Sequence, residues 1–280
     1  MPADLDNTAT LQCVVYTLTG SLIPGFFVSS IYIQNPKYRD DHPLEIKRRF
    51  QVVGVACSIS AVITYSLLAW KYSNPLEIMG VHLYGTIAAA VIPTLHTAVF
   101  YIGTLLICYL DGSWQLLFSA KQWRRSFKDI IWLKHIIVGP LLEEIAFRAC
   151  TAALFLHCFR PWVAIVLTPL FFASSHMHHL ISDIQDGLAW KSALNYRLVQ
   201  FGYTYLFGVY ATYVFTQTGH LIAPVMCHAL CNTLGVPAFA EVSLFPARDQ
   251  KWLWGAHVAG MLAFVAVLPY ALDSSLYTFI

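Results

Sequence analysis

Long apolar runs cover most of this 280-residue chain and constrain its fold more than any other feature. A bilayer core of about 30 Å requires about 20 mostly apolar residues per helix. The runs that meet or approach this length are 11–33, 50–70, 81–110, 130–158, 161–181, 193–216, 220–237 and 252–272. Because barrel strands alternate between apolar and polar residues and these runs do not, we predict an all-α polytopic membrane protein. We expect a bundle of about eight transmembrane helices that forms a single integral membrane domain over residues 1–280.

The composition excludes several other classes of protein. Hydrophobic residues make up 58% of the chain and charged residues 11%, whereas typical soluble domains have about 45–50% and about 25%. A soluble fold of this composition would have too little polar surface to cover itself. A disordered chain, a nucleic-acid-binding arm and a soluble cytosolic enzyme are therefore excluded, and a net charge of +2 gives no reason to expect a nucleic-acid partner.

The basic residues indicate the orientation in the membrane. Most of the 17 Lys and Arg residues lie in four alternate connections, 34–49, 111–129, 182–197 and 238–251. The first of these includes Lys37 and Arg39, whereas the opposite connections hold only Lys71 and Arg160. Because cytosolic loops carry such an excess of positive charge, we expect these four loops in the cytosol and both termini in the lumen.

Two smaller features carry expectations of their own. Residues 113–129 mix apolar and basic side chains, which is typical of a helix on the anionic cytosolic leaflet and equally of a solvated loop.

The seven cysteines all lie in apolar stretches. We therefore expect them to be small buried residues rather than a disulfide framework.

The fourth run places charged residues near the middle of the membrane, where they are costly and usually functional. Its sequence, KHIIVGPLLEEIAFRAC, contains Glu143, Glu144 and Arg148. Glu144 and Arg148 are spaced i, i+4 on one helix face and are expected to pair. Glu143 lies about 100° around the helix from Glu144 and has no cation on its own stripe, which suits a general base or a neutral hydrogen-bonding group. Pro140, one turn earlier, is expected to kink the helix.

The fifth run, LTPLFFASSHMHHLIS, presents polar groups on one helix face. Phe172 and His176 are spaced i, i+4, and His176 and His179 are spaced i, i+3. Pro169 offers a second kink before them. A histidine in a span is often only an interhelical hydrogen-bonding group, but three within four residues favour a functional site.

The seventh run, GHLIAPVMCHALCNTLG, places His228 and Asn232 at i, i+4, and Pro224 is expected to break the helix one turn before His228. Irregular backbone at membrane depth is tolerated where it lines a wet cavity. Glu143, His176, His228 and Asn232 could together supply a base, a partner for an attacking water and two donors for an oxyanion. We therefore expect the bundle to enclose an intramembrane catalytic cavity.

These three segments resemble the type II CAAX prenyl endopeptidases, the Ras-converting branch of the ABI family of intramembrane glutamic proteases. The family pattern EExxxR, FxxxH and HxxxN stands here over 143–148, 172–176 and 228–232. The resemblance covers a catalytic core of about residues 134–237. It implies that Glu143 and His176 activate water, that His228 and Asn232 stabilise the oxyanion, and that Glu144, Arg148 and Phe172 support the site.

The resemblance also implies the substrate and the location. Such an enzyme removes the last three residues from farnesylated or geranylgeranylated CAAX proteins, such as Ras-like small GTPases, without a metal or another cofactor. It would lie in the endoplasmic reticulum membrane, in contact with lipid and without nucleic acid, and its active site would open to the cytosol. Arg197 and Lys191 are candidates, by position alone, to receive the substrate's terminal carboxylate.

The residues alone also allow other mechanisms. A zinc protease could use Glu143, His176, His179 and His228 as ligands, although the sequence has no HExxH motif. A thiolate nucleophile at Cys150 would need a base nearby, and Glu143 is about two turns away. Buried charges on proline-containing helices also occur in proton- or ion-coupled transporters, although we find no repeated halves in this chain.

Overall fold

The computed structural model describes residues 3–33 and 41–277, and every regular element in these ranges is helical. All eight apolar runs form helices, which confirms the prediction of an all-α polytopic membrane protein. Four helices are long and apolar enough to cross a bilayer, at Ala9–Ser30, Pro43–Ala69, Pro161–Gln185 and Ala247–Ala271. The pair Thr86–Phe100 and Ile102–Leu110 would be a fifth span, although it is bent by 75° at Tyr101. This criterion therefore counts four or five of the eight expected spans.

The remaining runs fail the criterion for visible reasons. The helix Trp190–Thr218 is long enough, but its many threonine and tyrosine residues lower its mean hydropathy, and Ile222–Leu234 has only 13 residues. The run 130–158 changes helical type four times along its length. The long helix Trp190–Thr218 ends at Gly219, whose φ of +66° is the left-handed conformation that glycine accepts at a helix C-terminus.

The chain divides into two compact units, each described here by itself. Unit 1 comprises Met1–His82 and Leu142–Leu221, and unit 2 comprises Leu83–Leu141 and Ile222–Ile280. The single membrane domain over 1–280 and the catalytic core over 134–237 stay predictions.

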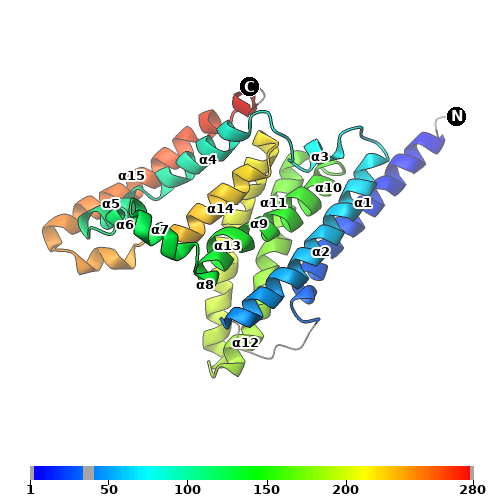
Figure 1. The fold of residues 1–280 in the computed structure, drawn as a ribbon. Coiled ribbons are helices and arrows are strands. Elements are labelled where there is room, and N and C mark those ends of the chain that lie inside the picture. Colours follow the sequence, from blue (N-terminus) through cyan, green and yellow to red (C-terminus); the bar gives the residue numbers. More distant parts are fainter. Residues whose placement is uncertain (1–2, 34–40, 278–280) are drawn as a thin grey trace. The chain divides into compact units, whose positions relative to one another are not determined.

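Unit 1 contains the first two motif segments. Its elements are α1 (Ala3–Ser30), α2 (Pro43–Ala69), α3 (Pro75–Ile78), π-helical η2 (Ile145–Ala152), α10 (Ala153–Leu156), α11 (Pro161–Ser175), the 3₁₀ turn η3 (His176–His178), α12 (His179–Gln185) and α13 (Trp190–Thr218). Helices α1 and α2 pack on each other and on η2, and α11 packs along α13 (Figure 1).

Small residues allow the close approach of helices in unit 1, as is common between membrane helices. A Cβ at Gly20 of α1 would lie 2.7 Å from the Phe155 ring, and a Cβ at Gly208 of α13 would lie 2.8 Å from Pro169. Helix α11 runs through Pro169 without a break, so the kink expected there does not interrupt the helix.

Unit 2 contains the third motif segment. Its elements are α4 (Thr86–Phe100), α5 (Ile102–Leu110), α6 (Trp114–Leu117), α7 (Ala120–Ser126), α8 (Ile130–Leu133), π-helical η1 (Lys134–Val138), α14 (Ile222–Leu234), the 3₁₀ segment η4 (Ala240–Leu244), α15 (Ala247–Ala271) and the 3₁₀ segment η5 (Ser274–Tyr277). Helix α4 packs against both α14 and α15. The Tyr101 hydroxyl, at the bend between α4 and α5, donates to the Gly235 carbonyl oxygen at 2.8 Å. The boundary between the units falls within α9 (Gly139–Glu144).

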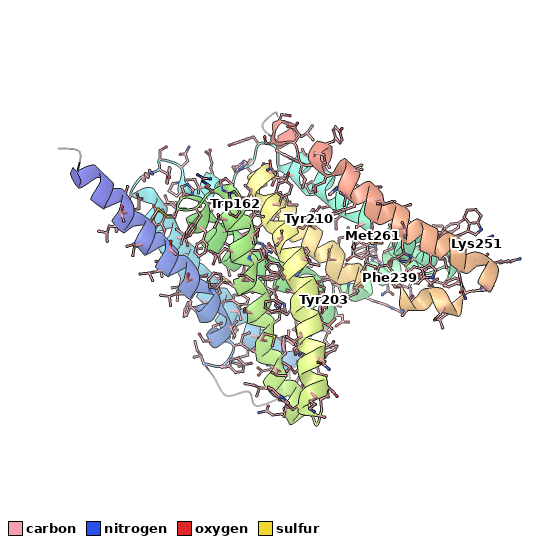
Figure 2. The ribbon with its side chains drawn as sticks, turned by 180° about the vertical axis from the view of Figure 1, so that it is seen from behind. Trp162, Tyr203, Tyr210, Phe239, Lys251 and Met261 are labelled. Atoms are coloured by element: carbon pink, nitrogen blue, oxygen red, sulfur yellow. A yellow bond between two sulfur atoms is a disulfide. The ribbon has the colours of Figure 1, made fainter. Side chains whose placement is uncertain are left out.

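Large apolar side chains point outward along the helices of both units. Figure 2 shows Trp162 of α11, and Tyr203 and Tyr210 two turns apart on α13. Trp162 is 64% exposed, and Leu262 of α15 is 67% exposed. Such exposure would be costly in water and is typical of helices that face lipid.

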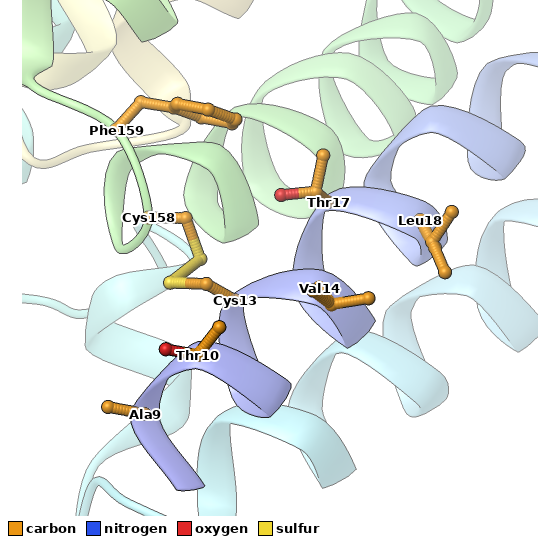
Figure 3. Close-up of a pocket in the computed structure, with 8 residues that line it drawn as sticks. All are labelled: Ala9, Thr10, Cys13, Val14, Thr17, Leu18, Cys158 and Phe159. Carbon is orange, nitrogen blue, oxygen red and sulfur yellow. A yellow bond between two sulfur atoms is a disulfide. The ribbon is translucent and has the colours of Figure 1, made fainter. Parts of the chain in front are cut away.

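The expectation that all cysteines remain thiols is wrong at two positions. Cys13 of α1 forms a disulfide with Cys158, which follows α10, across a sequence separation of 145 residues (Figure 3). The disulfide lies beside an open apolar groove whose lining includes Val14, Leu18 and Phe159. Sequence spacing could not reveal this pair, because both cysteines lie in runs that read as continuous apolar helices. The other five cysteines carry thiols.

The basic segment 113–129 forms the two short helices α6 and α7. Neither has a buried residue, and Trp123, Arg124 and Arg125 are all exposed. The segment is therefore helical in part, as the leaflet-bound interpretation requires. Lys37 and Arg39 of the first basic loop lie outside the described residues.

Candidate active site

The glutamate-bearing segment changes helical type around Pro140. The π-helical η1 precedes α9, and the π-helical η2 follows it directly. Proline has no N–H to donate, and widened π turns, which often occur at functional sites, accommodate this loss in place of the simple kink that we predicted. The Gly139 N–H bonds to the Lys134 carbonyl oxygen, and a Cβ at Gly139 would lie 2.5 Å from that oxygen, so the turn requires glycine.

Glu144 and Arg148 form a fully buried ion pair. Arg148 Nη1 donates to Glu144 Oε1 at 2.9 Å, and the two side chains are 1% and 0% exposed. This contact confirms the pairing that the i, i+4 spacing predicted. Because both charges have left water, the loss of either one would leave the other buried without its counter-charge.

Arg148 joins the ion pair to the helix that carries the second motif. Its guanidinium lies over the Phe172 ring at 4.6 Å and near the Phe207 ring at 5.9 Å, and Nη2 donates to the Gly208 carbonyl oxygen at 3.4 Å. Cation–π contacts of this kind strengthen when they are desolvated. Arg148 therefore links η2, α11 and α13 in one buried contact.

Phe172 in turn positions His176. The two rings meet edge to face with centroids 5.1 Å apart, and Phe172 also meets Phe147 edge to face at 5.0 Å. His176 Nδ1 lies 3.0 Å from the Phe172 carbonyl oxygen. A carbonyl oxygen only accepts, so this contact favours the hydrogen on Nδ1 and leaves Nε2 for a ligand. The contact thus favours the tautomer of His176 that a proton acceptor needs.

Glu143 precedes the paired Glu144 directly on the same helix. The residue is half-buried, and its Oε2 atom is buried. Cys57 of α2 lies within electrostatic range of Glu143 and donates from Sγ to the Leu142 carbonyl oxygen at 3.4 Å. Arg148 is also within electrostatic range of Glu143, although its ion pair is with Glu144.

The other two histidines of the fifth run make different contacts. His178 Nδ1 bonds to the Ser175 carbonyl oxygen, and its ring meets Tyr32 edge to face at 5.9 Å. The His178 and His179 rings lie 3.9 Å apart. His178 therefore faces the end of α1.

The third motif lies in α14 of unit 2. His228 is buried, with 7% of its surface exposed. Asn232 Nδ2 donates to the His135 carbonyl oxygen of η1 at 2.8 Å, so this π turn holds the amide in place. The break expected at Pro224 is instead a helix start, because Pro224 lies in the first turn of α14, where a missing N–H costs little.

The structure thus gathers the predicted residues in two groups. Glu143, Glu144, Arg148, Phe172 and His176 belong to unit 1, and His228 and Asn232 belong to unit 2. Their convergence on a single cavity stays a prediction.

The structure bears on two alternative chemistries, a cysteine nucleophile and a metal site. Cys150 is fully buried, at 0% exposure, where a peptide substrate does not reach its thiol. Among the described residues, no group of three or more His, Cys, Asp or Glu side chains is arranged to hold a metal ion.

Comparisons with known proteins bear on the activity of the site. A family model described as type II CAAX prenyl endopeptidase Rce1-like matches residues 127–234, which include all three motifs. CAAX prenyl protease 2 of Caenorhabditis elegans is 34% identical over 254 residues, covering 90% of this chain and 95% of that protein. The human protein of the same name is 33% identical over 285 residues, covering 95% of this chain and 84% of its own length. The chain belongs to the Rce1-like family.

The family membership makes the chain a membrane protease. A yeast relative, CAAX prenyl protease 2 of Saccharomyces cerevisiae, is 25% identical over 254 residues, covering 88% of this chain and 76% of its own length. No solved structure matches the chain significantly.

Some residues that shape the site of this Rce1-like protein could not be found from the sequence. Phe207 and Gly208 hold Arg148, Cys57 contacts the residue before Glu143, and the His135 carbonyl oxygen holds Asn232. Each of them acts across a helix–helix contact, and two act through backbone atoms. No spacing within one segment signals such contacts.

Proposed function

We propose that this protein is an endopeptidase that removes the C-terminal three residues from prenylated CAAX proteins. The observation that carries the proposal is the buried chain of contacts from Glu144 through Arg148 and Phe172 to His176. It links two of the three motifs of the family to which the chain belongs. The names of the relatives supply the substrate class.

Glu143, assisted by His176, activates the water that attacks the peptide carbonyl after the prenylated cysteine. Glu143 accepts a proton from the water, and the Nε2 atom of His176 accepts a hydrogen bond from it. The proton then passes to the leaving amine as the C–N bond breaks. The products are a new carboxylate on the prenylated cysteine and a free tripeptide.

His228 and Asn232 stabilise the oxyanion of the tetrahedral intermediate. An asparagine amide has two N–H donors, and the bond to His135 uses one of them. The second donor is the one that we assign to the oxyanion. A donor that is already held in place pays little free energy of reorganisation when the oxyanion forms, so it stabilises the transition state effectively.

The prenyl chain supplies much of the binding. Each buried CH₂ group contributes about 0.8 kcal/mol, so a farnesyl or geranylgeranyl chain in contact with lipid and apolar helix faces anchors the substrate. Ras-like small GTPases are the kind of protein that carries this signal.

The protein lies in the endoplasmic reticulum membrane with its active site open to the cytosol. The basic loops support this orientation. The disulfide supports it independently, because Cys158 lies in the connection that includes Arg160, which we expect in the lumen. Disulfides form in the oxidising lumen and are rare in the cytosol.

The test is tripeptide release by the full-length protein purified in detergent. A farnesylated CAAX peptide is incubated with wild type, and mass spectrometry follows the loss of the last three residues. Glu143→Gln should lower the rate by about 10²–10⁴-fold, because it removes the general base. Glu77→Gln, the same change at an exposed residue of α3, is the matched control and should leave the rate unchanged.

The outcomes separate the alternatives. Release of the tripeptide without a gradient or sealed vesicles contradicts a transporter. A near-normal rate for Glu143→Gln would contradict the assignment of the base. Activity that is lost on strong chelation and restored by zinc would replace the metal-free mechanism with the zinc protease.

A further inference from the structure

A cluster of charged side chains lies at one end of unit 1, outside the motif residues. The C-terminal end of α1, the N-terminal end of α2, the turn from η3 into α12 and the first turns of α13 contribute to it. Figure 1 shows the start of α2 beside α12. The cluster belongs to the side that the basic loops predict to be cytosolic.

On α2, two arginines share one carboxylate. Arg48 Nε donates to Glu45 Oε2 at 3.0 Å, and Arg49 Nε donates to Glu45 Oε1 at 3.1 Å. Glu45 is 1% exposed, and the two arginine side chains are 16% and 17% exposed. Arg48 also donates from Nη2 to the Ile31 carbonyl oxygen, which fixes it to the end of α1.

On α13, Arg197 already uses its donors within the protein. Nε and Nη2 form a two-point ion pair with Asp183 of α12, and Nη1 donates to Gln200. The cluster thus holds three guanidinium groups and two carboxylates. Arg197, a candidate by position for receiving the substrate carboxylate, joins α13 to α12 through this ion pair.

The arginines of the cluster interact electrostatically with the turn that carries His176 and His178. His178 interacts electrostatically with Arg49, with Arg197 and with His176. Arg49 on α2 is therefore within electrostatic range of the turn that begins at His176, the residue that we assign to the attacking water.

The distance along α2 matches the length of the tripeptide that the reaction releases. Cys57 of α2 contacts the Leu142 carbonyl oxygen, which places Cys57 at the level of Glu143. Arg49 precedes Cys57 by eight residues on the continuous helix α2, or about 12 Å at about 1.5 Å per residue. Three extended residues span about 10–11 Å. A substrate with its scissile carbonyl at the level of Glu143 can thus have its terminal carboxylate at the level of Arg49.

We propose that Arg49 binds the terminal carboxylate of the substrate and thereby sets the cleavage three residues from the C-terminus. This inference rests on the proposed function and adds a specificity-determining residue to it. A guanidinium suits the role because its planar donors match a carboxylate at two points. The contact of its Nε with Glu45 anchors the Arg49 guanidinium at the N-terminal end of α2.

The test compares two farnesylated CAAX peptides that differ only in a C-terminal carboxylate or carboxamide. For the wild-type full-length protein, kcat/KM for the acid should exceed kcat/KM for the amide by about 10–100-fold, the usual effect of a charge-assisted hydrogen bond. Arg49→Gln should lower kcat/KM for the acid by that factor, mainly through KM, and leave the amide unchanged. Arg49→Lys should keep part of the preference, because it retains the charge.

The ratio of the two substrates separates binding from folding, because both report on the same folded fraction of enzyme. Arg124→Gln, at an exposed arginine of α7, is the matched control and should leave the ratio unchanged. An equal loss for both peptides in Arg49→Gln, or a wild-type protein without preference for the acid, would overturn the inference. Failure of the wild type to cleave either peptide would instead overturn the proposed protease function, and this inference with it.

Discussion

The two motif-bearing regions hold their polar side chains in different ways. In unit 1, Glu144 and Arg148 are a buried ion pair, and aromatic rings enclose the guanidinium. In unit 2, the Asn232 amide bonds to a backbone carbonyl oxygen, and His228 is buried on the same helix. The first region is a buried ion pair whose members depend on each other, and the second consists of an imidazole and an amide on one helix.

Because of this difference, substitutions in the two regions should affect stability and catalysis to different extents. Removing one member of a buried ion pair strands a charge, so substitutions beside Glu143 should unfold the protein as well as inactivate it. Removing a neutral donor with a single hydrogen bond costs little stability. The comparison thus predicts that variants of unit 1 and of unit 2 lose activity for different reasons.

The largest effect on stability is expected for Glu144→Ala. It leaves Arg148 buried without its counter-charge and should cost about 3–5 kcal/mol in the free energy of unfolding. Thermal unfolding in detergent measures the loss. The double variant Glu144→Gln, Arg148→Met removes both charges and should be more stable than Glu144→Ala. A Glu144→Ala protein with wild-type stability would show that the pair does not support the fold.

A purely catalytic effect is expected for Asn232→Ala. Loss of one oxyanion donor should lower kcat by about 10²–10³-fold, and the lost bond to His135 should cost only about 0.5–1.5 kcal/mol in stability. Thr233→Ala, at the next residue, is the matched control. The Thr233 hydroxyl donates to the Ala229 carbonyl oxygen one turn earlier in the same helix. A loss of stability as large as that of Glu144→Ala would erase the contrast between the two regions.

The smallest effect on activity is expected at the disulfide of unit 1. Cys13→Ser removes a link between α1 and the end of α10 and should lower stability by about 2–4 kcal/mol. The rate of tripeptide release should stay unchanged at temperatures where the variant is folded. Cys108→Ser, at a half-buried thiol of unit 2, is the control and should match wild type in thermal unfolding. Equal stability of both variants would show that the disulfide does not hold unit 1.

Local spacing predicted the contacts that lie within one helix. The i, i+4 relation of Glu144 and Arg148 holds in the structure, and so does the contact of Phe172 with His176. These predictions succeeded because a helical turn brings such residues together whatever surrounds them. The all-helical architecture followed equally from the backbone's need for internal hydrogen bonds in lipid.

Contacts between helices were beyond the reach of spacing. The 75° bend at Tyr101 and the disulfide between Cys13 and Cys158 had no signal in the apolar pattern, and Pro140 predicted a kink but not the π turns on either side of it. The closed contact of Arg148 with Phe207 and Gly208 depends on how α13 packs against α11.

The sequence by itself determined that the chain is a helical membrane protein, and it determined which acids, histidines and amides share a helix face. It did so because hydropathy and helical periodicity are local properties of the chain. Only the tertiary structure decided that aromatic rings of α11 and α13 enclose Arg148, that the Gly208 carbonyl oxygen accepts from it, and that Asn232 donates to the His135 carbonyl oxygen. These features require groups from separate segments to meet, and the energy of a buried charge depends on all of them together.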